Sequence, residues 1–313
     1  MRWPPGSGAT LQALAFGYDA GGRRITMSGS AARVNLPPSL ASATYDANNR
    51  LAAWNGAAQS YDFNGNLTND GVQSYTWDSR DRLSALSGST PVSFSYDAFN
   101  RRTFKTAGTS QIGTLYDGFS EVNNFSDTSS TSTLLNGLGL DERYASTQGG
   151  VTLSFLPDAL GSTLNLVSPG GAMTAQFTYE PYGTATQSGT DNTAFRFTGR
   201  EEDGTGLMYC RGRYYFPRIS RFISEDPIGL AGGYNLYAYV DGDPVQYSDP
   251  EGLQITGFTR HGLNQAINRG VSPSSTRDAV LCPVLIQPMP NGTTRYTGSS
   301  AVVVLNPSGQ VVR

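Results

Sequence analysis

Histidine, cysteine and charged residues are all scarce in this chain of 313 residues. It contains one histidine, two cysteines and only 15% charged residues. The two cysteines, Cys210 and Cys282, cannot build a disulfide framework or a zinc cluster. No stretch approaches the ~18 apolar residues of a membrane span, and the start lacks the apolar core of a cleaved signal peptide. We therefore expect no cofactor, no metal and no membrane span, and export by a route without a signal peptide.

Glycine and tyrosine are abundant instead, with 37 and 17 residues. This composition favours many short strands joined by tight turns over long solvated helices. Charge is unevenly distributed: residues 254–313 contain five arginines and one acid, whereas 1–253 contain 17 basic and 24 acidic residues. We predict a mainly β body of negative charge, followed by a small basic tail.

An aromatic residue followed by aspartate recurs through the body. These pairs begin at Tyr18, Tyr45, Tyr61, Trp77, Tyr96 and Tyr116. Asn48-Asn49 and Asn64-Gly65 tolerate the positive φ of tight turns, and the aspartate can bond the turn backbone. Each unit therefore predicts strand, turn and strand, and successive hairpins must stack into a spiral sheet to share a core. Carbohydrate binding by the tyrosines is an alternative, although aromatic cores are far more common.

Two Asp-Pro-x-Gly-Leu motifs stand at the end of the body. They occupy 226–230 and 249–253, and the sequence changes character directly after the second. Asp-Pro is ordinarily a turn signal, but two carboxylates brought together can share a proton and act as acid and base. Leu253 is thus a predicted boundary, and paired aspartates are chemically able to hydrolyse a peptide bond.

The body resembles the Rhs family of polymorphic toxins, whose tyrosine-aspartate (YD) repeats spiral into a hollow cocoon. The motifs that carry this resemblance lie at 155–162, 179–183, 197–200, 207–215 and 221–229. Because family members commonly have more repeats, we expect a partial YD-repeat β-hairpin shell. The expected domains are 1–149 (YD repeats), 150–253 (Rhs-associated core with the cleavage motif) and 254–313 (C-terminal toxin).

The Rhs resemblance implies self-cleavage by an aspartic-protease-like pair. Carried over to this sequence, Asp226 and Asp249 are the pair, and the bond between Leu253 and Gln254 is cut. Glu225, Asp241 and Asp243 remain further candidates for the carboxylates, and Arg221 is a candidate for keeping one of them ionised.

The tail predicts a small α+β domain, with two helices followed by an antiparallel sheet. Apolar spacing within 260–269 and a Ser272-Pro273 start favour the helices. The turn Asn291-Gly292 precedes predicted strands at 294–297, 301–305 and 311–312. One His, one Cys and one carboxylate cannot assemble a metal nuclease or a zinc deaminase. Metal-free chemistry on an anion remains, in which histidine moves protons and arginine stabilises phosphate charge.

The tail also resembles small RNase toxins grouped around barnase, colicin E5 and RelE, through the opening from His261 to Arg269-Gly270-Val271-Ser272-Pro273. Related tails tend to continue past the last Val-Val of this sequence. The candidate ribonuclease residues are His261, Arg269, Arg277, Tyr296 and Thr297 for catalysis, with Arg260 and Arg295 for substrate binding.

The leading hypothesis is an interbacterial toxin made in a bacterial cytoplasm and then secreted or delivered from the cell surface. It releases a ribonuclease into the target-cell cytoplasm. The implied partners are RNA, possibly tRNA, a cognate immunity protein and components of a secretion apparatus. Two alternatives stay open: an adhesive YD-repeat surface protein with a degenerate tail, and a thiol hydrolase that uses Cys282 and His261.

Overall fold

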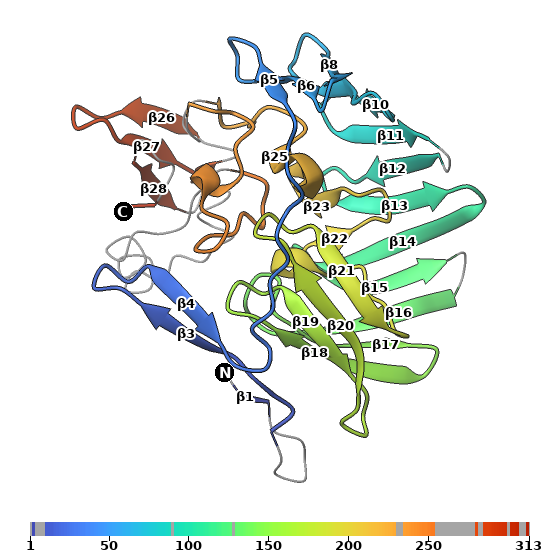
Figure 1. The fold of residues 1–313 in the computed structure, drawn as a ribbon. Helices are drawn as coiled ribbons and strands as arrows, with labels where there is room; N and C mark the ends of the chain where they lie inside the picture. Colours follow the sequence, from blue (N-terminus) through green and yellow to red (C-terminus); the bar gives the residue numbers. More distant parts are fainter. Residues whose placement is uncertain are drawn as a thin grey trace.

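A computed structural model provides the fold. It describes residues 2–3, 10–88, 91–126, 129–229, 234–253, 279–280, 284–298, 301–306 and 311–312. The chain is mainly β, as the composition predicts, and its largest element is a single curved antiparallel sheet that occupies one side of the molecule (Figure 1).

This sheet, here called the wall, contains 14 strands that follow one another in chain order. The wall consists of β8 (Ser60–Tyr61), β9 (Leu67–Asn69), β10 (Ser74–Trp77), β11 (Leu83–Ser87), β12 (Val92–Tyr96), β13 (Arg102–Ala107), β14 (Ser110–Asp117), β15 (Ser120–Ser126), β16 (Ser129–Asn136), β17 (Arg143–Gln148), β18 (Val151–Pro157), β19 (Thr163–Val167), β20 (Met173–Tyr179) and β21 (Ala185–Gly189). Each strand pairs antiparallel with the next, so every connection is a hairpin. The sheet continues through the turn at 149–150, where the sequence divides the two body domains.

Smaller sheets accompany the wall. They are β1 (Arg2–Trp3) with β2 (Gln12–Ala13), β3 (Ala15–Tyr18) with β4 (Arg24–Ser28), β5 (Ala43–Tyr45) with β6 (Leu51–Trp54) and β7 (Ala57–Ala58), β22 (Glu201–Glu202) with β23 (Met208–Cys210), β24 (Arg213–Phe216) and β25 (Arg221–Phe222), and β26 (Leu285–Pro288) with β27 (Thr294–Thr297) and β28 (Val302–Leu305). Short 3-10 helices are η1 (Phe197–Gly199), η2 (Pro217–Ile219) and η4 (Val240–Gly242).

The repeated aromatic-aspartate pairs form one recurring turn. In the unit at Asp78, the Oδ1 atom accepts the backbone N–H groups of Arg80 and Arg82, and Oδ2 accepts the Arg82 Nε–H at 2.8 Å. Asp81, the fourth residue of this turn, has a φ of 58°. Burial acts to raise the pKa of the Asp78 carboxyl, but the hydrogen bonds from Arg82 and the backbone outweigh it and lower that pKa. The predicted strand-turn-strand unit is confirmed.

Sequence spacing predicts most of these turns but not all. Asp46 and Asp97 repeat the geometry of Asp78, each with an arginine four residues later. Asp158, which no aromatic precedes, forms the same turn with the backbone N–H groups of 160 and 162. Tyr116-Asp117 instead ends a tight hairpin in which Asp117 pairs with Ser120. The same turn geometry therefore also forms where no aromatic residue precedes the aspartate.

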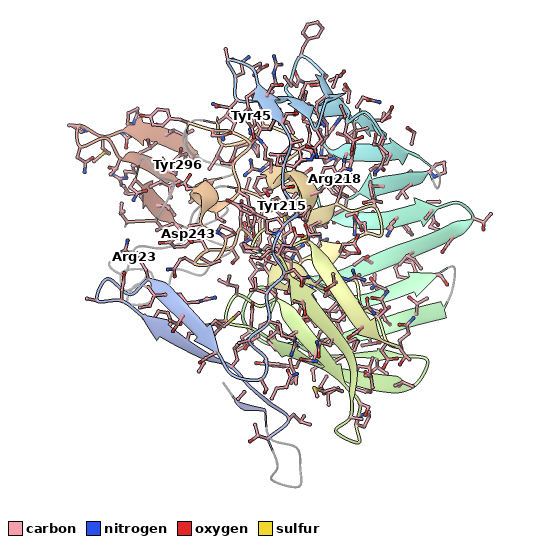
Figure 2. All side chains as sticks on the ribbon, viewed as in Figure 1. Arg23, Tyr45, Tyr215, Arg218, Asp243 and Tyr296 are labelled. Atoms are coloured by element: carbon pink, nitrogen blue, oxygen red, sulfur yellow. The ribbon has the colours of Figure 1, made fainter. Side chains whose placement is uncertain are left out.

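Residues 195–229 and 234–253, here called the plug, pack against the concave side of the wall (Figure 1). Alternate residues of the plug strands enter two different cores, because side chains on a strand alternate between faces. Met208 and Tyr215 join a cluster with Phe177 of the wall, whereas Tyr209 and Tyr214 join a cluster that includes wall strands β10 to β12. Tyr215 lies near the centre of the molecule (Figure 2). Burial on both faces explains the nearly continuous aromatic run of this segment.

Buried ion pairs connect the plug to the wall. Arg102 on β13 pairs with Asp203 at 2.7 Å, and both side chains are almost fully buried. Arg200 pairs with Asp141 at 2.6 Å. Because an unpaired buried charge is costly, each of these pairs specifies where the plug meets the wall.

An extended segment from residue 32 to 42 links the β3–β4 hairpin to β5 and crosses the front of the plug in Figure 1. Asn35 attaches it to the wall: its N–H donates to Tyr179 O at 2.9 Å, and its side chain donates to Thr186 Oγ1. The N-terminal hairpin thus lies near one end of the wall and β5 near the other.

Of the predicted tail domain, the structure supports only the antiparallel sheet. The strands β26, β27 and β28 form an antiparallel meander, and Val311 adds a bridge to Leu305. The two predicted helices lie in residues outside the described ones, apart from Ala279 and Val280, which are helical. The prediction of a two-helix α+β domain is therefore unsupported, and β26 is a strand that the sequence did not predict.

Candidate self-cleavage site

The two motif aspartates lie together in the plug, on either side of one arginine. Asp226 follows β25 and Asp249 follows η4, and both side chains are buried. The Nη2 atom of Arg213, on β24, is 2.9 Å from Asp226 Oδ2 and 3.6 Å from Asp249 Oδ2. The fold thus brings two carboxylates that are 23 positions apart in the sequence to the same guanidinium.

Arg213 is held in place on several sides. Its guanidinium lies over the Phe222 ring, 3.6 Å from the centroid, and Nη1 donates to Leu236 O at 2.8 Å. Nε donates to Gly252 O, one residue before Leu253. Burial lowers the pKa of Arg213, although both aspartates oppose this change. This arginine connects the aspartate pair to the peptide segment that is predicted to be cut.

Each Asp-Pro motif forms the turn that its sequence predicts. Asp226 Oδ1 accepts the Ile228 N–H at 3.0 Å, and the Gly229 N–H donates to Asp226 O at 2.8 Å. Asp249 Oδ1 accepts the Leu253 N–H at 3.0 Å. The second turn therefore places the Asp249 carboxylate at the backbone N–H of Leu253. Leu253 also supplies the carbonyl group of the candidate scissile bond.

Asp249 has the electrostatics of an acid that is protonated near neutral pH. Burial raises its pKa to about 7, with a further contribution from Asp226, while Arg213 partly offsets the rise. Among the described residues, Oδ2 of Asp249 has no hydrogen-bond partner. A protonated Oδ2 has a hydrogen to donate, which suits Asp249 to the role of the acid in a carboxylate pair. Asp226, whose Oδ2 lies 2.9 Å from Arg213 Nη2, is the second carboxylate of the pair.

A cavity of about 630 Å³ adjoins this site. Arg213, Asp226 and Leu253 contribute to one side of it, and turns of the wall, including Asn64 and Asn100, contribute to the other. A water molecule needs only a small fraction of this volume. The cavity therefore gives Asp226 access to the water that hydrolysis consumes.

The other candidate acids lie elsewhere in the plug. Glu225 accepts a hydrogen bond from the Tyr237 hydroxyl at 3.3 Å. Asp241 is exposed on η4, and Asp243, which directly follows that helix, is half-buried (Figure 2). Among the described residues, the ion pairs of Arg213 are with Asp226 and Asp249. The pair centred on Arg213 is thus Asp226 and Asp249.

Arg221 has a structural role that differs from the predicted one. It donates to Asn49 O and Asn235 Oδ1, and its guanidinium lies over the rings of Tyr45 and Tyr237. The arginine beside the aspartates is Arg213, which sequence reasoning missed. The available signal was a charged residue inside a run that is otherwise aromatic and buried, because a buried arginine requires an acidic partner.

Most of the candidate tail residues lie outside the described part of the chain. These are Gln254, Arg260, His261, Arg269, Arg277 and Cys282. On β27, Tyr296 is buried in a core with Val303 and Leu305, against which Ile228 of the plug packs. Burial, with a contribution from Asp226, raises the pKa of Tyr296.

Arg295 and Thr297 lie on the opposite face of β27 from Tyr296, since strand residues alternate. Arg295 is exposed and Thr297 half-buried. The structure therefore places these two candidates on one face and gives Tyr296 a place in the tail core.

Other kinds of site find little support in the described residues. Within that part of the chain there is no group of three or more His, Cys, Asp or Glu side chains that could hold a metal ion, and no helix that is long and apolar enough to cross a membrane. Cys210 is buried, and burial raises its pKa to about 12, which makes it a poor nucleophile. The repeat tyrosines also hold the sheet together: the Tyr96 hydroxyl donates to Leu83 O at 2.7 Å.

Comparison with known proteins identifies the same architecture. The sequence model of the teneurin YD-shell family matches residues 7–245. The chain is 28% identical to the tRNA nuclease WapA of Bacillus subtilis (strain 168), over 96% of this chain and 16% of that protein. It is 36% identical to the toxin subunit YenC1 of Yersinia entomophaga, over 32% of this chain and 11% of that protein.

A solved structure shares the fold. The crystal structure of TcdB2-TccC3-Cdc42 superposes with a TM-score of 0.57 at 19% identity, covering 80% of this chain and 17% of that one. The chain thus spans about a sixth or less of the length of these relatives. The likeness to the solved structure concerns the fold alone.

Proposed function

Because the chain belongs to the teneurin YD-shell family and is homologous to YD-repeat toxins, we propose that it is a self-cleaving toxin of the Rhs type. The observation that carries this proposal is the arrangement of Asp226 and Asp249 around Arg213, with the Leu253 amide bound to Asp249. The bond that is cut joins Leu253 to Gln254, and the released piece is 254–313.

The proposed reaction is a hydrolysis in which one carboxylate acts as the base and the other as the acid. Asp226, paired with Arg213, accepts a proton from a water molecule as the water oxygen attacks the Leu253 carbonyl carbon, and Asp249 donates its proton to the carbonyl oxygen, which gives a tetrahedral diol. Asp226 then passes its proton to the Gln254 nitrogen as the C–N bond breaks, and a diol hydroxyl returns a proton to Asp249 as the new carboxyl group of Leu253 forms. One water is consumed, and no cofactor is needed.

Intact mass after expression of the full chain tests the cleavage. We expect a 60-residue fragment, 254–313, that Asp226→Asn and Asp249→Asn each abolish because each removes one partner of the proton exchange. Asp241→Asn is the matched control: it changes an exposed acid of the plug and leaves release unaltered. An uncleaved wild-type chain after days near neutral pH contradicts the proposal.

We further propose that the released tail is a metal-independent ribonuclease whose substrate is RNA, with tRNA as the candidate class. The match to the tRNA nuclease WapA covers 96% of this chain and so extends beyond Leu253 into the tail, which supports this function. His261 is the proposed proton carrier, and Arg269, Arg277 and Thr297 complete the catalytic set, with Arg260 and Arg295 as binding residues. Tyr296, the remaining candidate, supports the domain core.

RNA cleavage by the released fragment in EDTA is the corresponding measurement. We expect activity on tRNA or bulk RNA that His261→Ala abolishes and Arg295→Ala weakens. Gln287→Ala, an exposed change on the neighbouring strand β26, serves as the control. A folded wild-type fragment that cuts neither RNA refutes the ribonuclease proposal and leaves the self-cleavage proposal standing.

The biological setting follows from these two activities. A ribonuclease harms its own producer, so we propose a cognate immunity protein as a partner, and secretion-apparatus components as the carriers to a neighbouring bacterium. The toxin then acts in the target-cell cytoplasm.

A further inference from the structure

The hairpin turn between β23 and β24 contacts the peptide segment that leads to the candidate scissile bond. Three successive carbonyls of that segment each receive a hydrogen bond from the turn. The donors and acceptors are Arg211 Nη1 to Pro250 O at 2.6 Å, Gly212 N to Glu251 O at 2.9 Å, and Arg213 Nε to Gly252 O. The segment is thus held at every residue between Asp249 and Leu253.

The two turns fit so closely that glycine is required in the second one. Gly252 has a φ of +64°, and a Cβ atom there would lie 2.5 Å from Cys210 O and 2.7 Å from Arg213 N. Arg211 itself has a φ of +57°, which is unfavourable for any residue that has a Cβ atom. A non-glycine residue in this conformation at a functional site suggests that its side chain is needed there.

Asp141 fixes the direction of the Arg211 side chain. Its Oδ1 atom is 2.8 Å from Arg211 Nη2 and its Oδ2 atom is 3.1 Å from Nη1, the paired geometry that orients a guanidinium most strongly. The Asp141 side chain is 6% exposed and also pairs with Arg200. Burial opposes ionisation, yet Arg200 and Arg211 lower the pKa of this carboxyl.

The donors of the Arg211 guanidinium reach the Phe119 and Pro250 carbonyls and the Asp141 carboxylate. The Arg211 side chain therefore positions the segment that leads to Leu253, whereas Asp226 and Asp249 carry out the proposed reaction. Asp141 lies in the connection from β16 to β17, so the contact also runs from the wall to the segment.

We propose that Arg211, oriented by Asp141, is the positioning residue that selects which peptide bond the aspartate pair cuts. This inference rests on the proposed self-cleavage. By holding the Pro250 carbonyl, Arg211 sets the register of the following residues and presents the bond after Leu253. Without that contact the segment shifts, so that cleavage becomes slower and neighbouring bonds are cut as well.

The test compares the full-length wild-type chain with Arg211→Ala and Arg211→Lys. Product masses give the rate and the position of the cut across a range of pH. Loss of one charge-assisted hydrogen bond predicts release by Arg211→Ala that is slower by about 10- to 100-fold, with ends displaced from Leu253. Lysine keeps the charge but cannot pair with both oxygens of Asp141, so Arg211→Lys gives an intermediate rate. The pH midpoint stays that of the wild type.

Arg218→Ala is the matched control, because it removes a half-exposed arginine of the same plug and leaves both rate and cut position unchanged. A folded Arg211→Ala chain that releases one product, ending at Leu253, at the wild-type rate overturns the inference. If Arg211→Ala does not fold, Arg211→Lys replaces it in the test. A folded Arg211→Lys chain that releases one product, ending at Leu253, at the wild-type rate then overturns the inference.

The reaction itself is established first, by wild-type release that Asp226→Asn and Asp249→Asn abolish. Failure at that step refutes the proposed self-cleavage and the role of Arg211 with it. A normal Arg211 variant in a chain that does cleave refutes the positioning role alone.

Discussion

Self-cleavage is expected to slow as the pH rises through about 7. Asp249 must carry the proton that goes to the Leu253 carbonyl, and burial raises its pKa to about 7. A carboxyl with a raised pKa is protonated below that value and loses its proton above it. The protonated, active form of Asp249 is therefore depleted above about pH 7. Below that pH, the protonation of Asp249 does not limit the rate of self-cleavage.

The size of the effect follows from that pKa. Above it, the protonated fraction of Asp249 falls about tenfold for each pH unit. The rate constant at about pH 9 is therefore expected to be about 100-fold below its value near pH 6. An Asp249 pKa near the ordinary 3.8 would place the same decline far below neutrality, so the two cases are easily distinguished.

A pulse-chase experiment measures this profile. The chain is labelled in a short burst of cell-free translation, transferred to buffers of different pH, and followed by the loss of full-length product. Asp241→Asn, which alters an exposed acid, should reproduce the wild-type curve. A rate that stays level between pH 6 and pH 9, or that increases with pH, refutes the assignment of Asp249 as the acid.

Three further substitutions test the surrounding structure. Gly252→Ala should destabilise the chain by at least about 1 kcal/mol and stop self-cleavage, because the new Cβ would lie 2.5 Å from Cys210 O; normal release, seen by intact mass, would contradict the tight fit. Arg102→Met should cost about 3–5 kcal/mol in urea unfolding, since Asp203 stays buried without its closest cation, and a loss below about 1 kcal/mol would argue against this ion pair. Asp78→Ala should lower stability by about 1–2 kcal/mol by removing the acceptor of one repeat turn, whereas an unchanged melting temperature would show that the turn forms without it.

The sequence alone predicts the features that depend on residues within a few positions of one another. The turn at Asp78 needs only its own backbone and Arg82, so an aspartate followed by an arginine four residues later gives the same turn at Asp46 and Asp97. The hairpin order of the wall follows, because consecutive short connections allow only neighbouring antiparallel strands. The turns at Asp226 and Asp249 are equally local, and the family resemblance already singles out both residues.

Sequence patterns miss an element where a different sequence forms the same local hydrogen bonds. Asp158 forms the repeat turn without an aromatic before it. The β26 strand lies in a stretch that contains Pro283, Pro288 and Pro290 and carries no alternating pattern. Arg221, the candidate for keeping a carboxylate ionised, donates to Asn49 and Asn235 instead, and the arginine beside the acids is Arg213. Both arginines flank aromatic residues, and sequence spacing does not say which one faces the acids.

Only the tertiary structure decides what surrounds the aspartate pair. Arg213, Asp226 and Asp249 come from separate segments of the plug, and Asp141 comes from the wall, so their contacts depend on how the aromatic plug packs into the curved sheet. The same packing removes water from Asp249 and raises its pKa to about 7. Local sequence determines the turns that carry these side chains, whereas long-range burial determines their protonation and their partners, because desolvation depends on every segment that covers the site.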